Sequence, residues 1–494
     1  MIQVMSAGPQ VSYTFAQRFG VFIDWQDDKA RLACRQDVAP MALAEVQRLL
    51  GFLPQLDALP DDEFRKSLSQ CFQTDSSQAM QMVESMGDHM DLSSLAEAVP
   101  ESADLLEQEG DAPVIRLINA LIAEAVRVKA SDIHIETFEQ RLLVRFRVDG
   151  VLREMVEPRR ELAPLLVSRI KVMAKLDIAE KRVPQDGRIA VRIGGHGVDL
   201  RVSTLPAANG ERVVMRLLDQ QAAQLSLANM QIPDPVLAGL RDVIQRPHGI
   251  VLVTGPTGSG KTTTLYAALS ELNHASRNIL TVEDPIEYQL PGIGQTQVNN
   301  KAEMTFAKGL RAMLRQDPDV VMVGEIRDLE TADIAVQASL TGHLVLSTLH
   351  TNTSVGAITR LKDMGVEPFL LASGLQAVLA QRLLRVLCKH CKQPYKPDDS
   401  ECALLEIEAS SKLELFRPQG CDHCAQTGYQ GRSGIYEWLL IDEEFRRMIH
   451  RGAAESDLRD HARRHYGSLR DDGVSRVLSG QTSLEELLRV TQAD

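Results

Sequence analysis

The sequence predicts a multidomain α/β protein whose C-terminal part is built on a mostly parallel β-sheet. At 494 residues the chain is too long for one ordinary hydrophobic core, because domains usually hold about 100–200 residues. Segments between residues 141 and 218 alternate apolar and polar side chains, which favours an antiparallel sheet. Short, almost entirely apolar runs, which suit strands buried on both faces of a parallel sheet, follow at residues 249–255, 278–284, 319–325 and 344–350.

The composition is that of a globular protein without a membrane-spanning segment. Hydrophobic residues make up 44% of the chain and charged residues 24%, and no apolar run approaches the ~18 residues of a transmembrane helix. The longest apolar stretch, residues 365–387, is expected near a helix and carries several charged side chains. The N-terminus, MIQVMSAGPQVSYTF, lacks the basic and apolar regions of an export signal. We therefore expect a cytoplasmic protein whose membrane contact is at most peripheral.

The net charge of −13 is concentrated in one segment. Residues 67–115 contain ten Asp or Glu side chains and no Lys or Arg. A chain with this balance does not bind a phosphate backbone through bulk charge, although a local basic pore lining is compatible with it. We therefore expect no nucleic-acid partner.

The N-terminal part divides into a small module and a connector. Residues 1–75 mix short apolar groups with polar turns, which predicts an N-terminal α/β or α-rich module. Residues 76–111 are acidic and rich in Ser, Met and Glu, which predicts a flexible linker. The first module is therefore expected to move relative to the rest of the chain, as suits a docking role.

Residues 112–222 predict a second domain, an antiparallel sheet with helices. Apolar residues recur at helical spacing from residue 112 through Ala130 and then alternate, so a helix is expected to lead into a strand. Hairpin turns are expected at Asp149-Gly150 and at Gly194-Gly195. Residues 241–494 then form the domain with the parallel sheet.

The strongest motif is GPTGSGKT at residues 255–262, which follows an apolar strand and precedes a helix-like segment. This is the context of a P-loop, in which glycines let the backbone wrap around phosphate oxygens and a helix N-terminus supplies N–H donors. In such a loop Lys261 reaches the β- and γ-phosphates and Thr262 holds Mg²⁺. The candidate nucleotide-binding residues are Gly255, Pro256, Thr257, Gly258, Ser259, Gly260, Lys261, Thr262 and Thr263.

Three polar groups follow other strands of the same predicted sheet. The run 319-DVVMVGEIRD-328 resembles a Walker B strand, in which an acid at the tip contacts Mg²⁺ or the attacking water. Its tip reads Gly324-Glu325, so Glu325 is expected to be the base and to contact Mg²⁺. Glu283 and His350 follow two further strands, and His350 is expected to sense the γ-phosphate. The division of roles between Glu283 and Glu325 stays open.

Five motifs resemble, in the same order, those of the type II/IV secretion ATPases, and are closest to those of type II secretion. The resemblance covers residues 112–494 and rests on SDIHIE, GPTGSGKTTTLYA, ILTVEDPIEY, GEIRD and LSTLHTN. It implies a RecA-like P-loop ATPase domain preceded by a PAS-like α/β domain, with a hinge at residues 223–240. It also implies ATP and Mg²⁺ as cofactors and a ring of six chains.

The same resemblance implies arginine fingers from the sheet domain. The candidates are Arg201 in DLRVST and Arg216 in ERVVMRLL. A guanidinium from a mobile element neutralises the charge that develops in phosphoryl transfer and is worth ~10³-fold or more in rate. By pattern alone both arginines are exposed strand residues without a catalytic role. Weaker candidates for ring or phosphate contacts are Arg315, Arg327 and Arg360.

Four of the seven cysteines form two C-x₂-C pairs, CKHC at 388–391 and CDHC at 421–424. Paired knuckles of this spacing are typical of a tetrahedral structural zinc site, with Cys388, Cys391, Cys421 and Cys424 as ligands. Disulfides are disfavoured by a reducing cytosol, and a redox role by the lack of a thioredoxin-like context. His390 and His423 are expected to be bystanders, and the remaining cysteines, which are Cys34, Cys71 and Cys402, to be unpaired thiols.

The resemblance implies an oligomeric motor that hydrolyses ATP to drive pseudopilus assembly and protein export by a type II secretion system. Residues 385–435 are expected to form the zinc subdomain, which within the family favours assembly over retraction, and residues 437–494 a helical C-terminal part. The implied partners are a single-span inner-membrane component, bound through residues 1–111, and a polytopic platform protein; acidic phospholipid is a further candidate. The alternative within the family is a type IV pilus-extension or DNA-uptake ATPase.

Two rivals come from other classes. A nucleic-acid motor on a related core is disfavoured by the acidic balance and by the lack of an aromatic-basic stretch. A scaffold that binds nucleotide without hydrolysing it is disfavoured by Glu283 and Glu325.

Overall fold

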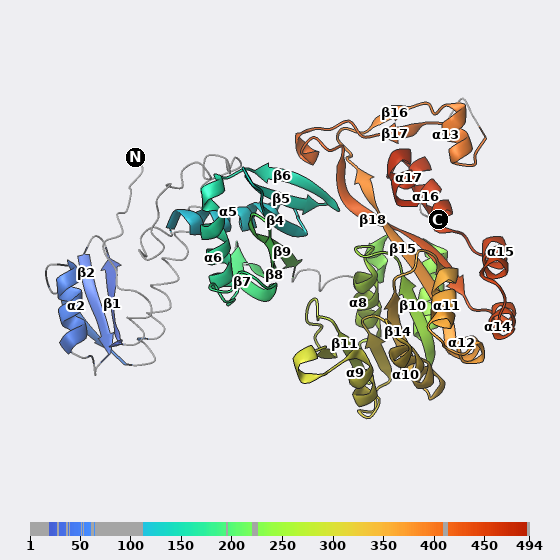
Figure 1. The fold of residues 1–494 in the computed structure, drawn as a ribbon, viewed down its shortest axis with the longest axis horizontal. Helices are drawn as coiled ribbons and strands as arrows, with labels where there is room; N and C mark the ends of the chain where they lie inside the picture. Colours follow the sequence, from blue (N-terminus) through green and yellow to red (C-terminus); the bar gives the residue numbers. More distant parts are fainter. Residues whose placement is uncertain are drawn as a thin grey trace. The chain divides into compact units, whose positions relative to one another are not determined.

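The computed structural model contains sheets of three, six and seven strands, each the base of a module, and a small two-stranded sheet in the C-terminal part (Figure 1). It describes residues 19–26, 29–35, 38, 40–50, 52, 54–60, 64, 112–193, 196–219, 226–408 and 413–491. The expected linker at 76–111, the turn at Gly194-Gly195 and Cys71 lie outside these ranges. Within the described ranges, every helix is too short or too polar to cross a bilayer.

In the described part of the N-terminal module, a helix packs against a three-stranded sheet. Its elements are β1 (Val21–Gln26), β2 (Lys29–Arg35), α2 (Pro40–Leu50) and β3 (Gln55–Leu59). Strand β2 lies in the centre, antiparallel to β1 and parallel to β3. The core between helix and sheet contains Val21, Ile23, Leu32, Val46 and Phe64, all buried. The module is therefore α/β, one of the two forms that the sequence predicts.

The second module is a six-stranded sheet with the order β6-β5-β4-β9-β8-β7. The central strand β4 runs antiparallel to both β5 and β9. The predicted helix at 112–130 ends at Arg127, and the predicted hairpin turns at Asp149 and Gly150, both with positive φ (49° and 83°). The elements are α5 (Ala112–Arg127), β4 (Asp132–Thr137), β5 (Leu142–Val148), β6 (Val151–Val156), α6 (Ala163–Met173), β7 (Gln185–Ile193), β8 (His196–Ala207) and β9 (Gly210–Asp219).

The third module is a seven-stranded sheet with the order β12-β11-β13-β14-β10-β15-β18. All neighbouring pairs are parallel except β15 with β18 at the edge. The four predicted apolar strands are confirmed as β10, β11, β13 and β14, which lie side by side. The strands are β10 (Gly249–Thr254), β11 (Ile279–Glu283), β12 (Gly294–Gln297), β13 (Val320–Val323), β14 (Leu344–Leu349), β15 (Leu375–Leu387) and β18 (Tyr429–Leu440).

Helices cover both faces of this sheet (Figure 1). One core holds α7 (Asp234–Ile244) and α8 (Lys261–Leu272) against one face. The opposite core holds α9 (Phe306–Met313), α10 (Leu329–Leu340), α11 (Ser354–Asp363) and α12 (Pro368–Gly374). Burial of both faces explains why the strands are so apolar, since no side of them meets water.

Residues 226–240, assigned to a hinge from the resemblance, pack into the third module. The segment Leu227–Met230 forms a 3₁₀ turn, and α7 follows it with Leu240, Val243 and Ile244 buried in the core. The phenol of Tyr436 on β18 also donates to the carbonyl of Met230 (3.1 Å). Residues 226–240 are therefore part of the third module in this structure.

The expectation of a helix near residues 365–387 holds only for the first part of that stretch. Residues Pro368–Gly374 form α12, and the remainder is the 13-residue strand β15 between β10 and β18. The polar side chains that interrupt the stretch are bonded inside the domain: Gln381 accepts from the Thr264 hydroxyl (2.6 Å), and Arg382 donates to the carbonyl of Val490. These contacts let a strand with polar residues lie within the sheet.

The C-terminal part is mostly helical, as predicted, although β18 extends to Leu440. Two short strands, β16 (Gln393–Tyr395) and β17 (Leu415–Arg417), pair in the excursion after β15, which also holds α13 (Asp399–Leu404). Four helices follow β18: α14 (Glu443–His450), α15 (Glu455–His465), α16 (Leu469–Leu478) and α17 (Leu484–Thr491).

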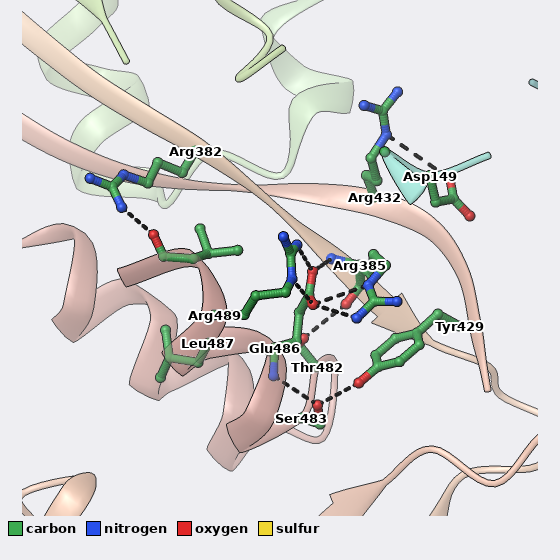
Figure 2. Close-up of polar contacts among 12 residues, drawn as sticks. Asp149, Arg382, Arg385, Tyr429, Arg432, Thr482, Ser483, Glu486, Leu487 and Arg489 are labelled. Carbon is green, nitrogen blue, oxygen red and sulfur yellow. Dashed lines mark hydrogen bonds and ion pairs between the residues drawn. The ribbon is translucent and has the colours of Figure 1, made fainter. Parts of the chain in front are cut away.

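A buried ionic cluster fastens α17 to β15 where the excursion begins (Figure 2). The Glu486 carboxylate is fully buried and accepts from the guanidinium groups of Arg385 (2.7 and 3.0 Å) and Arg489 (2.6 and 2.8 Å). The Arg385 guanidinium also stacks 4.1 Å from the ring centroid of Tyr429. Because a buried carboxylate is costly without such partners, this cluster fixes the position of α17.

Candidate active site

The loop 255–260 joins β10 to α8 and is shaped by glycine. Gly255 has φ 147°, and a Cβ there would lie 2.3 Å from the carbonyl oxygen of Gln381. Gly260 has φ 88°, and a Cβ there would lie 2.8 Å from the Gln381 amide nitrogen. A Cβ at Gly258 would meet no atom within 4 Å, so the backbone there borders open space. The loop therefore has the close backbone wrap and the free space that phosphate oxygens need.

Lys261 starts α8 and turns its side chain back over the loop. Its Nζ donates to the carbonyls of Gly255 (2.8 Å) and Pro256 (3.2 Å). Burial lowers the pKa of Lys261, against the opposing charge of Glu325. A phosphate bound in the loop would place a negative charge beside this buried ammonium group. Thr262, the next residue, is exposed, with its side chain available to a cation.

The parallel strands bring the predicted groups to one edge of the sheet. Thr254 of β10 pairs with Leu349 of β14, and Val282 of β11 pairs with Val323 of β13. The residues that follow therefore face one cleft, whose lining includes Lys261, Thr262, Glu283, Glu325 and His350. This is the carboxyl edge at which open α/β sheets bind ligands.

The Glu325 carboxylate has two basic side chains as neighbours. Arg327 Nη2 donates to its Oε1 (2.5 Å), and His350 Nε2 lies 3.3 Å from its Oε2. Burial raises the pKa of Glu325, but the hydrogen bond and charge of Arg327, with His350, outweigh it and lower the pKa overall. The carboxylate is therefore ionised at neutral pH. Sequence analysis ranked Arg327 as a weak candidate, and the structure places it beside this acid.

Glu283 lies at the end of β11 and is almost completely buried (3% exposed). Its Oε1 accepts from the Thr281 hydroxyl (2.5 Å) and from the Gln295 amide (3.0 Å). Its Oε2 accepts from the phenol of Tyr266, on α8. The sequence did not predict Tyr266 and Gln295 as neighbours of Glu283. The position of Tyr266, one helical turn after Thr262, was the one feature that could have indicated its place near the site.

Gln381 is a further neighbour of the loop that the sequence did not indicate. Its amide oxygen accepts from Thr264 on α8, and its backbone oxygen and amide nitrogen border Gly255 and Gly260. It lies on β15, the strand that was expected near a helix, so its contact with the loop could not be foreseen.

Arg201 and Arg216 are directly opposite each other on β8 and β9 of the six-stranded sheet. Arg216 Nε donates to Oδ1 of Asp132 (2.8 Å), in the SDIHIE segment. Burial raises the pKa of Asp132, but the hydrogen bonds of Arg216 and Ser131 outweigh it and lower the pKa. Arg201 Nη2 is buried and has no hydrogen-bond partner among the described residues. Of the two arginines, Arg201 thus keeps an unused donor.

The four predicted zinc ligands come together. All four Sγ atoms lie within 4.8 Å of one another, and three pairs are 3.7–3.8 Å apart. A tetrahedral zinc with Zn–S bonds of about 2.3 Å sets its sulfurs about 3.8 Å apart, so the cluster fits this metal. A disulfide needs about 2.05 Å, and all four are free thiols. The rings of His390 and His423 stack on each other, with centroids 4.2 Å apart.

A family model described as "Type II/IV secretion system protein" matches residues 107–489. The chain belongs to this family. A second model, for an N-terminal domain of "GSPII protein E", matches residues 10–72. The type II secretion system protein E of Pseudomonas aeruginosa is 60% identical over 98% of this chain and 97% of its own length. The type II secretion system ATPase E of Vibrio cholerae is 58% identical over 98% of this chain and 97% of its own length.

Solved structures agree with the fold of this secretion ATPase. The pilus retraction motor PilT with bound ADP is 27% identical and covers 76% of this chain and 96% of its own, with a TM-score of 0.53. The Legionella pneumophila ATPase DotB, 22% identical over 80% of this chain and 99% of its own, has a TM-score of 0.57. The predicted family, fold class and ATP-hydrolysing activity are confirmed. The pilus-extension alternative has less support, because the curated relatives at 51–60% identity over nearly the whole chain are type II secretion proteins.

Proposed function

We propose that this secretion ATPase is the motor of a type II secretion system, which hydrolyses ATP to drive pseudopilus assembly and protein export. One observation carries the proposal: a P-loop whose Lys261 shares a cleft with Glu283, Glu325 and His350 occurs in a chain 60% identical to a type II secretion protein E. The motor works in the cytoplasm as a homo-oligomer, and the proposed form is a hexameric ring.

In the proposed site, the P-loop binds the triphosphate and the strand ends act on it. The backbone N–H groups of 255–263 and the Lys261 ammonium hold the phosphates, and Thr262 and Glu325 hold Mg²⁺, which neutralises phosphate charge when bound. Because the transition state of phosphoryl transfer is loose, the attacking water needs orientation more than a strong base. Glu325, kept ionised by its cationic neighbours, suits that task. Glu283 is the second proposed acid and His350 the proposed γ-phosphate contact.

The sheet domain is proposed to supply the arginine fingers. The two arginines are proposed to have different roles. Arg201 has a buried donor without a partner among the described residues, whereas the side chain of Arg216 is bonded to Asp132 and must leave it, or share it, to reach an anion. Closure of the sheet domain on the P-loop domain would then couple nucleotide binding to movement.

The cysteine cluster is proposed to hold a structural zinc. Four thiolates complete a tetrahedral coordination sphere, so no open position remains for chemistry. Backbone N–H groups of Cys421 and Gly428 point at Cys424 Sγ, each at 3.2 Å, and would stabilise a thiolate there. The zinc would fasten the excursion of residues 385–435, which has only a small apolar core.

The N-terminal module is proposed to dock onto the cytoplasmic part of a single-span inner-membrane component through residues 1–111. Large apolar side chains exposed among the described residues of this module include Met41 (80%), Phe52 (53%) and Leu56 (47%), which support a binding role. In this proposal the ring is attached peripherally to the inner membrane and acts on a polytopic platform protein, with acidic phospholipid as a further contact.

Complementation tests the proposed function. A strain that lacks its own type II secretion ATPase should regain export of its secreted proteins when it produces the wild-type chain with the cognate membrane components. The Lys261→Ala variant should accumulate to the same level without restoring export. Restoration of type IV pili, but not of export, by the wild-type chain would instead favour the pilus-extension alternative.

A further inference from the structure

A hydrogen-bond network holds the carboxylate of Glu283 on one side. Four side chains form it: Tyr266 on α8, Thr281 and Glu283 on β11, and Gln295 on β12. The network therefore joins the helix that begins at Lys261 to two neighbouring strands of the sheet. Tyr266 is 1% exposed and Glu283 3%, so water does not compete for these contacts.

The direction of the hydrogen bond from Tyr266 is fixed by its other neighbours. The Tyr266 oxygen lies 3.4 Å from the backbone nitrogen of Glu287 and 3.4 Å from the Gln295 amide nitrogen, both of which can only donate. Its own hydrogen is therefore left for Glu283. Burial and the charge of Glu283 both raise the pKa of Tyr266, which keeps the phenol protonated as a donor.

The network leaves the Glu283 carboxylate with one free acceptor site. An ionised carboxylate has about four lone-pair sites, two on each oxygen. Thr281 and Gln295 fill both sites on Oε1, and Tyr266 fills one on Oε2. The remaining site belongs to Oε2. Because Glu283 lines the cleft that contains Lys261, this site is the one that can meet a water there.

The position of Tyr266 in the sequence links this arrangement to the cation site. Tyr266 follows Thr262 by four residues in α8, so the two side chains lie on the same face of the helix, one turn apart. A contact from Tyr266 to Glu283 therefore sets the distance between the carboxylate and the residue proposed to hold Mg²⁺.

We infer that Tyr266 and Gln295 are positioning residues, which hold the Glu283 carboxylate so that a single lone pair of Oε2 is directed at the water in the nucleotide cleft. The inference rests on the proposed function, because it assigns work to Glu283 during hydrolysis. Neither residue touches nucleotide; both act through Glu283.

The test compares two Tyr→Phe changes that remove the same atom at different places. In the full-length oligomeric protein, Tyr266→Phe should lower kcat for ATP about ten- to hundred-fold, as expected for losing a hydrogen bond to a charged group. KM for ATP should stay within about two-fold, because the P-loop contacts remain. The matched control is Tyr288→Phe, whose ring packs edge-on against Tyr266 with centroids 4.6 Å apart. Among the described residues its hydroxyl forms no hydrogen bond with Glu283, so kcat should stay near the wild-type value.

The split between kcat and KM separates positioning from simple damage to the fold. Gln295→Met, on the edge strand β12, removes a second donor to Glu283 without altering α8 and should also lower kcat while KM for ATP stays within about two-fold. Wild-type kcat in both variants would overturn the inference, as would a loss that appears in KM and leaves kcat unchanged.

A double-mutant cycle distinguishes failure of the inference from failure of the proposed function. If Tyr266 acts through Glu283, Tyr266→Phe should add nothing to Glu283→Gln. An additional ten-fold loss in that background would overturn the inference while leaving Glu283 in the chemistry. If Glu283→Gln alone hydrolysed ATP at the wild-type rate, the proposed role of Glu283 would fail, and this inference with it. Failure of the whole P-loop assignment would appear separately, as full activity of Lys261→Ala.

Discussion

Replacing Arg385 with leucine should destabilise the P-loop domain strongly, because it leaves a buried carboxylate short of its partner. Glu486 is 0% exposed and accepts from the Arg385 guanidinium and from that of Arg489. Removing one partner of a buried ion pair typically costs about 3–5 kcal/mol. Arg489 remains in place, so we expect the lower end of this range, about 3 kcal/mol. For a domain of this size that corresponds to a fall in Tm of about 6–12 °C.

Scanning calorimetry of the full-length protein is the assay, following the transition that a bound ATP analogue raises. The comparison variant is Arg489→Leu: it also removes a partner of the buried Glu486, but the Arg489 side chain is 54% exposed and water can partly replace it, so the loss should be smaller, about 1–2 kcal/mol. Burial raises the pKa of Glu486, but the hydrogen bonds from Arg489 and Arg385 have the larger effect, so the pKa is lowered overall. The stabilisation is therefore complete above the unfolded pKa of about 4.3 and is lost as the pH falls through the folded value. A Tm for Arg385→Leu within about 2 °C of the wild type at pH 7 would refute this reasoning.

Three further predictions concern the other parts of the site. Purified protein should contain about one zinc per chain, and Cys388→Ser should lose most of it and become sensitive to proteolysis within residues 385–435, as expected for a structural site. Arg201→Ala should lower kcat by ~10³-fold with little change in nucleotide affinity, and Arg216→Ala should also weaken the sheet domain by removing its ion pair. Arg327→Leu should raise the pKa of Glu325, so the acidic limb of the pH–rate profile should move to higher pH, measured between about pH 5 and 8.

Each of these outcomes has a contrary result. Metal analysis that finds no zinc in freshly purified protein, with the excursion still resistant to protease, would contradict the structural zinc. Wild-type kcat in Arg201→Ala would remove that arginine from phosphoryl transfer. An unmoved acidic limb in Arg327→Leu would mean that the rate does not depend on the ionisation of Glu325.

Much of the P-loop domain could be predicted because both faces of its sheet are buried. That burial demands continuous apolar runs, which stand out in the sequence at β10, β11, β13 and β14. The carboxyl ends of parallel strands meet at one edge, so Glu283, Glu325 and His350 could be expected together before any contact was known. The cysteine cluster could also be predicted, since two C-x₂-C pairs are typical of a structural zinc site.

The contacts that tune these groups could not be predicted, because they depend on which strands are neighbours. Tyr266 and Gln295 meet Glu283 from α8 and β12, and nothing in their local sequence marks them as its partners. In the sequence Gln381 is a polar residue within an apolar stretch. Its contact with the glycine loop follows from the pairing of β15 with β10, which the sequence does not show. Long-range pairing of this kind overrides local pattern.

Hydrolysis by Glu325→Gln protein tests the central claim most directly. The change keeps the shape of the side chain and leaves the P-loop intact, so binding of a fluorescent ATP analogue should match the wild type within about two-fold. Turnover by the assembled protein should fall by at least about a hundred-fold, because the ionised group proposed to orient the attacking water is gone. Equal turnover by the wild-type and Glu325→Gln proteins, at equal nucleotide occupancy, would contradict the account.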